Sequence, residues 1–338
     1  MTEPADLVFI GGTGRSGTTV LSHLLDHHSR FRGVPIECRF HCNPKGLADV
    51  VGGRATVQEF LEKLRTYWWY RIRVGSRAVV PAGVVGRVRV AGTRLGWRLH
   101  PRRDGAQPRV RGLHEIVPRQ RFDAAVERFE ANCNEDLLGA SRDLFYDLLG
   151  PLAAEAGKPA LVEMSSFTIA DAPELARIFP DARFVHIVRD GRDSGVSKVH
   201  LREKAHHPTD AASGIEFWAD RLQQAEEGVR GLEPDDRHRL HLVGLDEIVW
   251  GDREGAYAGL LAFLGVSDEP AMREFFELEM TADAAHRERW REGLGPAEQR
   301  EIIARYEATL ERLEREGYHC APLLRRSYER TLAPDPRS

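Results

Sequence analysis

The sequence contains little cysteine and no long apolar run, and each shortage excludes a class of protein. Its 338 residues include only four cysteines, too few and too irregularly spaced for a disulfide scaffold, so we expect a reducing compartment. No apolar stretch approaches the length that crosses a bilayer, and the first apolar run already begins at Leu7. The net charge of −4 gives no overall attraction to nucleic acid. We therefore expect a soluble cytoplasmic protein.

Lysine is scarce as well. Only five of the 48 basic residues are lysines, so any anion site must be built mainly from arginine guanidinium groups.

Cys38, His41 and Cys42 lie close together in the sequence, which suggests a metal site. Their spacing matches no common zinc pattern, so we expect buried or incidental thiols and no bound metal.

A glycine-rich turn between two apolar segments occupies residues 9–26, with the sequence FIGGTGRSGTTVLSHLLD. The apolar residues predict a buried strand, then a helix, and the glycines between them allow a tight turn. Free backbone N–H groups and a helix N-terminus favour a phosphate at such a turn. The spacing from Gly12 fits the nucleotide-binding pattern G-x-x-x-x-G-K-[ST], except that Thr18 stands in place of the lysine. The cation is instead Arg15, inside the turn.

A second motif follows another apolar run in the middle of the chain. Residues 184–188 read FVHIV and predict a strand, and residues 189–197 read RDGRDSGVS, a turn that opens a helix. A solvated turn whose charges pair with one another would have the same composition. A functional interpretation of this motif therefore depends on the first motif.

Together the two motifs resemble those of sulfotransferases that use 3′-phosphoadenosine 5′-phosphosulfate (PAPS). The glycine-rich turn resembles the loop that binds the 5′-phosphosulfate, and the second motif resembles the segment that binds the 3′-phosphate. The resemblance implies PAPS as co-substrate. For the 5′-phosphosulfate it implies Gly14, Arg15, Ser16, Gly17, Thr18 and Thr19. For the 3′-phosphate it implies Arg189 and Ser197.

The segment after the first predicted helix, residues 28–40, looks like the corresponding segment of protein-tyrosine sulfotransferases. In those enzymes a glutamate two residues before an arginine is the general base, and the matching residues here are Glu37 and Arg39. A base is needed because the acceptor hydroxyl must lose its proton during transfer. A structural ion pair between Glu37 and Arg39 is the alternative.

The next predicted strand, ALVEM, departs from the family at its end. Related enzymes commonly place a lysine there to contact the transferring group, whereas this chain continues from Glu163 as EMSS. Ser165 and Ser166 could take over by hydrogen bonding. The leading candidate for the cation that contacts the sulfuryl group is Arg15, which we therefore count as catalytic with Glu37, and Lys198 is a weaker candidate.

A basic segment with a tryptophan, residues 286–291, precedes a predicted helix at residues 296–315. In sulfotransferases a basic C-terminal loop that contains tryptophan folds over the nucleotide. By this resemblance Arg287, Arg289 and Trp290 are candidate nucleotide-binding residues. A solvent-facing loop leading into the helix fits the sequence equally well.

The whole pattern predicts an α/β fold with a mostly parallel sheet flanked by helices, which the resemblance makes similar to P-loop kinases. We expect one domain over residues 1–332 and a disordered tail at 333–338. Residues 71–121 form an arginine-rich insert of loops or irregular hairpins, either on the acceptor side or solvated. Other expected helices span residues 57–70, 135–152, 172–179, 214–232 and 257–264, and other expected strands span residues 160–164 and 240–243.

Three functions remain open at this stage. The first is a PAPS-dependent sulfotransferase that acts by in-line displacement on a hydroxyl of a carbohydrate, glycolipid, peptide or natural product. The second is an ATP- or GTP-dependent phosphotransferase, which the missing lysine disfavours. The third is a nucleotide-binding module without catalysis. We expect a small-molecule or glycan acceptor and no nucleic acid or membrane span, and the sequence leaves the acceptor and the oligomeric state undetermined.

Overall fold

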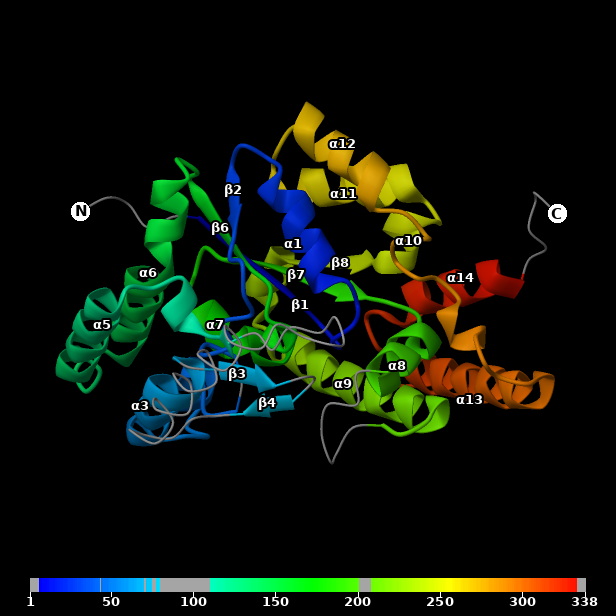
Figure 1. The fold of residues 1–338 in the computed structure, drawn as a ribbon, viewed down its shortest axis with the longest axis horizontal. Helices are drawn as coiled ribbons and strands as arrows, with labels where there is room; N and C mark the ends of the chain where they lie inside the picture. Colours follow the sequence, from blue (N-terminus) through cyan, green and yellow to red (C-terminus); the bar gives the residue numbers. More distant parts are fainter. Residues whose placement is uncertain are drawn as a thin grey trace, which may run out of the picture.

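The computed structural model describes residues 6–42, 44–69, 71–74, 77–79, 110–200 and 208–332 (Figure 1). Its centre is a parallel sheet with the strand order β2-β6-β1-β7-β8. Because every pair of neighbours is parallel, the carboxyl ends of these strands lie at one edge, where α/β proteins bind their ligands. The strands are β1 (Asp6–Gly12), β2 (Phe31–Gly33), β6 (Ala160–Glu163), β7 (Arg183–Val188) and β8 (Leu240–Gly244).

Helices cover both faces of the sheet, which confirms the expected α/β fold (Figure 1). One face packs against α1 (Thr18–Asp26), α11 (Arg253–Leu264) and α12 (Pro270–Glu279). The other face packs against α6 (Leu137–Glu155), α7 (Ala172–Ile178) and α9 (Ala211–Gly231). A third core joins α9 to α8 (Gly191–His200), α13 (Pro296–Arg315) and α14 (Ala321–Leu332). No helix within the described ranges combines the length and apolar composition needed to cross a membrane.

Strand β1 is buried on both sides, as its uninterrupted apolar sequence predicts. Leu7 and Phe9 belong to the core that contains α6 and α7, whereas Val8 and Ile10 belong to the core that contains α1. Alternate residues of a strand point to opposite faces, so this division follows from the strand geometry. The glycine-rich turn is therefore attached to a rigid central strand.

Helices α8 and α9 approach each other closely at two glycines. A Cβ atom added to Gly195 would lie 2.6 Å from the backbone carbonyl carbon of Gly214, and one added to Gly214 would lie 2.8 Å from that of Gly195. Only glycine allows this separation of the two backbones. The contact fixes the side chains at the end of α8 relative to those of α9.

The remaining elements differ most from the sequence expectations. The expected helix at residues 57–70 is α3 (Val57–Lys63), which continues as a π-helix at Leu64–Trp68. The arginine-rich segment contains a small antiparallel sheet and the start of a helix that we did not expect. Besides β2, α12 and α14, the elements for which no helix or strand was expected are β3 (Arg71–Val74), β4 (Arg77–Val79), β5 (Val110–Arg111), α2 (Leu47–Val51), α5 (Arg119–Asn132) and α10 (Leu245–Val249). The greater part of residues 71–121 and the predicted tail at 333–338 lie outside the described residues.

Candidate active site

The turn after β1 adopts left-handed backbone angles at three positions. The φ angles are 78° at Gly14, 63° at Arg15 and 102° at Gly17, the residue that caps α1. A side chain at Gly17 would be strained and would also meet Leu245, because its Cβ would lie 2.9 Å from the Leu245 Cδ1. Arg15 adopts a conformation that costs free energy for a non-glycine residue, which often marks a functional site.

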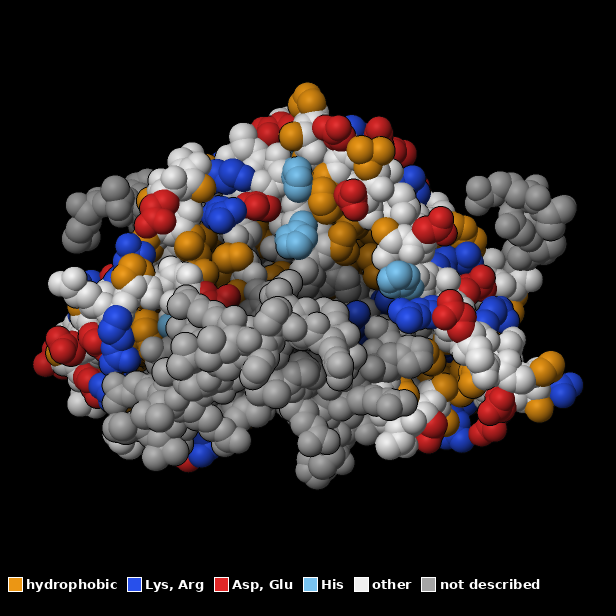
Figure 2. Space-filling view, in the orientation of Figure 1, with side chains coloured by type: hydrophobic (Ala, Val, Ile, Leu, Met, Phe, Trp, Pro, Cys, Tyr) orange, Lys and Arg blue, Asp and Glu red, His pale blue; other side chains and the backbone are white. Residues whose placement is uncertain are grey.

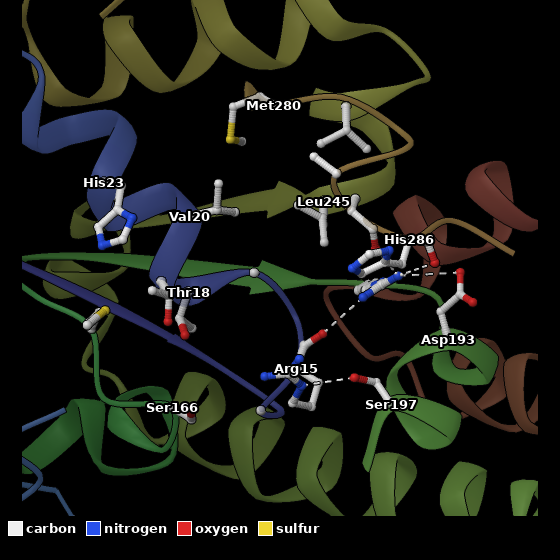
Figure 3. Close-up of a pocket in the computed structure, with 18 of the residues that line it drawn as sticks. Arg15, Thr18, Val20, His23, Ser166, Asp193, Ser197, Leu245, Met280 and His286 are labelled. Carbon is white, nitrogen blue, oxygen red and sulfur yellow. Dashed lines mark hydrogen bonds and ion pairs between the residues drawn. The ribbon is translucent and has the colours of Figure 1, made fainter. Parts of the chain in front are cut away.

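A cavity of about 630 Å³ lies where this turn meets the carboxyl ends of the strands. Figure 3 shows that Thr18, Val20 and His23 of α1 line one side of it and that Arg15 and Ser197 lie on the other. In the space-filling view, histidine, apolar and basic side chains gather near the middle of the same face (Figure 2). The expected site residues that line the cavity are Gly14, Arg15, Gly17, Thr18, Thr19, Glu37, Arg189, Ser197 and Arg289.

The two expected phosphate-binding motifs are bonded to each other. Arg15 donates a hydrogen bond from Nε to the Ser197 Oγ over 2.9 Å (Figure 3). Arg189 donates a long one from Nη1 to the Arg15 carbonyl oxygen over 3.5 Å. These contacts join the end of β1, the end of β7 and the helix α8 at one point of the cavity wall.

Arg189 also holds the segment that follows α12. Its Nη2 donates to the carbonyl oxygens of Ala285, at 2.6 Å, and His286, at 3.1 Å, and lies 3.6 Å from the Asp193 carboxylate. Its side chain is almost buried, and its Nε has no hydrogen-bond partner among the described residues. Arg189 therefore presents a desolvated positive charge at the cavity wall.

Glu37 lies at the opposite side of the cavity between two polar neighbours. It forms an ion pair with Arg39 and accepts a 3.1 Å hydrogen bond from the Ser166 Oγ. The Ser166 carbonyl oxygen also accepts a hydrogen bond from the Gly12 N–H over 2.8 Å. Ser166 thus links the carboxylate of Glu37 to the start of the glycine-rich turn, a link that the sequence alone did not reveal.

Glu163, at the end of β6, is buried and does not line the cavity. Its carboxylate accepts hydrogen bonds from the Ser165 Oγ, over 2.6 Å, and from the Cys38 N–H, over 3.3 Å, and lies 3.0 Å from the Nε2 of buried His41. It therefore anchors the loop that carries Glu37. Burial raises the pKa of the Cys38 thiol, so this cysteine is a neutral core residue.

The three expected lid residues have different surroundings. Trp290 is fully buried beneath Arg192, whose guanidinium lies 4.8 Å from the ring centre, so it does not line the cavity. Arg287 stacks on Trp250 at 3.4 Å, and only Arg289 reaches the cavity. Trp290 departs from the expectation because the loop turns inward there: the backbone N–H of Trp290 donates to the Asp193 carboxylate over 3.1 Å.

Asp193 is the anchor of this loop and was not among the expected site residues. Its carboxylate accepts hydrogen bonds from the backbone N–H groups of Glu288 and Trp290. Burial and the neighbouring Asp190 raise the pKa of Asp193 to about 6. Its position inside the RDGRD sequence gave no signal for this contact, because the partners lie almost one hundred residues later.

Comparison with known proteins gives one family and several solved structures. The model of the sulfotransferase family matches residues 86–270, more than half of the chain, including the Arg189 motif but not the glycine-rich turn. The sulfotransferase domain of the Synechococcus PCC 7002 olefin synthase is 18% identical, with 91% of this chain and 95% of that chain covered and a TM-score of 0.46. Sulfotransferase STF1 from Mycobacterium tuberculosis is 14% identical, with 90% and 76% covered and a TM-score of 0.42. No curated protein matches the chain.

Proposed function

Because the chain belongs to the sulfotransferase family, we propose that it transfers a sulfuryl group from PAPS to a hydroxyl group of an acceptor. The observation that carries this proposal is the junction of the two motifs: Arg15 is bonded to Ser197, and Arg189 to the Arg15 carbonyl. A nucleotide with phosphates at both the 5′ and the 3′ position needs two separate anion sites near each other, and the contact between the two motifs supports such an arrangement.

The turn offers groups that suit the phosphosulfate. The Oγ of Ser16 is buried and has no hydrogen-bond partner among the described residues, and a Cβ at Gly14 would meet nothing within 4 Å, so a ligand can approach the backbone there. The N-terminus of α1 adds its N–H groups and the positive end of its dipole. Arg15 and Arg189 would neutralise the phosphates in place of the lysine of nucleotide-binding loops.

Glu37 is the proposed general base. PAPS supplies a sulfuryl group on a good phosphate leaving group. As the bond from sulfur to the phosphate oxygen breaks, a bond from sulfur to the acceptor oxygen forms, and the Glu37 carboxylate takes the hydroxyl proton. The hydrogen bond from Ser166 and the ion pair with Arg39 fix the orientation of the carboxylate. Arg15 would stabilise charge on the transferring group.

Binding and transfer assays test this proposal. Calorimetry is expected to show that adenosine 3′,5′-bisphosphate binds at least about tenfold more tightly than 5′-AMP, ATP or GTP, because only the bisphosphate fills both anion sites. Labelled sulfate from PAPS is then expected to appear on one member of a panel of carbohydrates, glycolipids, peptides and phenols. Equal affinity for 5′-AMP and the bisphosphate, together with transfer of labelled phosphate from ATP, would contradict this proposal and favour the alternative function, a phosphotransferase.

A further inference from the structure

A second cavity adjoins the first on the side of Glu37. Its volume is about 920 Å³, and the four residues Gly14, Arg39, Ser166 and Lys198 line both cavities. Since the first cavity contains the expected nucleotide-binding motifs, the second is the space from which an acceptor could reach the proposed base. The residues that line it therefore indicate which chemical groups the acceptor carries.

Cationic and aromatic side chains meet where the two cavities join. The guanidinium carbons of Arg39 and Arg221 lie 5.9 Å and 4.6 Å from the centre of the same ring, that of Phe167. Arg221 also lies 5.0 Å from the centre of the Phe217 ring, and the Lys198 Nζ lies 5.4 Å from it. Stacking on aromatic faces holds the charges in place while it leaves donor groups at the edges of the guanidinium groups.

The backbone around this cluster is closely packed. Phe217, Arg221, Gln224 and Gly228 follow one another at helical spacing on α9, and all four line the second cavity. A Cβ atom on Gly228 would lie 2.1 Å from the carbonyl oxygen of Ile169, so α9 is in direct contact with the segment that carries Phe167. The position of Arg221 over the Phe167 ring is thus set by the fold.

The carboxylates of the second cavity are engaged elsewhere. Asp49, Asp171 and Glu174 all bind Arg54, and Glu227 accepts a 3.0 Å hydrogen bond from Gln223. Glu37, which lines the first cavity, is bound to Arg39.

Arg221 has a hydrogen bond to the Gln224 Oε1, over 2.7 Å, but no ion pair with a carboxylate in the part of the chain that the structure describes. Burial lowers the pKa of Arg221, and the charge of Arg39 lowers it further against the opposing effect of Asp220. Because its hydrogen-bond partner Gln224 is neutral, the positive charge of Arg221 is poorly compensated. An anion placed between Arg221 and Arg39 would remove this repulsion.

We propose that Arg221 and Arg39, with Lys198 at the same junction, bind an anionic group of the acceptor. The acceptor would then carry a carboxylate, sulfate or phosphate group besides the hydroxyl that accepts the sulfuryl group, on a flat or apolar body that contacts Phe167 and Phe217. This inference rests on the proposed function and adds the substrate class to it.

Two probes of nearly equal shape test the assignment. Protein saturated with adenosine 3′,5′-bisphosphate, which fills the donor sites, is titrated by calorimetry with 4-hydroxyphenylacetate and with its neutral amide, 4-hydroxyphenylacetamide. The carboxylate is expected to bind about tenfold or more tightly than the amide, as charge-assisted hydrogen bonds require. Arg221→Met, which keeps an apolar side chain over the two rings, should remove this preference, and Arg221→Lys should keep part of it.

Controls separate this result from misfolding. Arg128→Met, which changes an exposed arginine of α5 paired with Asp147, should keep the full preference. The affinity of Arg221→Met for the bisphosphate should stay unchanged. Equal affinities of the two probes, including no binding of either, or a preference that persists in Arg221→Met, would overturn the assignment. Failure of the bisphosphate to bind would count against the proposed function. The relative affinities of the two probes for the protein would still decide whether Arg221 binds an anionic group.

Discussion

The Nε of Arg15 donates a 2.9 Å hydrogen bond to the Oγ of Ser197, although the two residues lie 182 positions apart in the chain. Arg15 belongs to the glycine-rich turn and Ser197 to α8, so the bond connects the two motifs that we expect to bind the two ends of one nucleotide. Arg189 adds a second connection through the Arg15 carbonyl. The two motifs are therefore coupled through protein contacts, so a substitution in one can alter the geometry of the other.

Replacement of Arg189 by alanine is expected to weaken binding of adenosine 3′,5′-bisphosphate by about tenfold or more. A charge-assisted hydrogen bond to a phosphate contributes roughly 1.5–3 kcal/mol, and Arg189 is already desolvated. The affinity for 5′-AMP, which lacks the 3′-phosphate, should change much less. Calorimetry with both nucleotides measures the difference. An equal loss for the two would mean that Arg189 acts only by holding Ala285 and His286.

Glu37→Gln is expected to reduce turnover by about 10²–10⁴ and to leave the affinity for the bisphosphate nearly unchanged. The reason is that a general base acts on the acceptor, whereas glutamine keeps the size and one acceptor oxygen of the side chain. Ser166→Ala, which removes only the hydrogen bond to Glu37, should reduce turnover less. Turnover that is unaltered in Glu37→Gln would leave Glu37 as a structural partner of Arg39.

The sequence was informative where the structure is local. The strand, the turn and the helix of residues 6–26 lie where the apolar pattern and the glycines predicted them, and the helix from Pro296 to Arg315 has the expected bounds. The contacts that shape the site depend on residues far apart in the chain. Ser166 bonded to Glu37 and Asp193 bonded to the loop at Trp290 are examples, because no spacing rule connects them.

Two further differences have physical reasons. The basic sequence around Trp290 suggested a lid residue. In the structure the guanidinium of buried Arg192 instead lies over the rings of Trp290, Tyr306 and Tyr328, and this contact holds Trp290 in the core. The helix α12 was missed because it is short and its buried stripe consists of only two residues, Met272 and Phe276, while Leu278 is exposed.

Asp193→Ala is expected to release the loop at residues 286–291. The variant leaves the N–H groups of Glu288 and Trp290 without the carboxylate that accepts their hydrogen bonds. Trypsin should therefore cleave after Arg287, Arg289 or Arg291 faster than in the unmodified protein, as mass spectrometry of a time course would show. Asp235→Ala, in the turn before β8, is the matched control and should leave the rate unchanged. If Asp193→Ala also leaves it unchanged, Asp193 does not anchor the loop.

The last prediction concerns Asp171, which lines the second cavity and shares Arg54 with two other carboxylates. Burial, with the charge of Asp49, raises the pKa of Asp171 to about 8, because a single guanidinium divided among three carboxylates compensates each only in part. In the unfolded chain the same group has its ordinary pKa near 3.8. Between these two values the folded protein holds a proton that the unfolded chain has lost.

The contribution of Asp171 to stability is therefore fully present below about pH 4 and is lost as the pH rises to about 8, by at most about 1.4 kcal/mol per pH unit. Asp171→Asn removes this titration, so the free energy of unfolding of the variant should rise relative to that of the unmodified protein between pH 5 and pH 8 and level off above. Urea unfolding of both proteins in the same buffers measures the difference between their free energies of unfolding. The contributions of the other titrating groups are the same in both proteins and cancel in this difference. A difference that stays constant over this range would mean that Arg54 keeps Asp171 ionised.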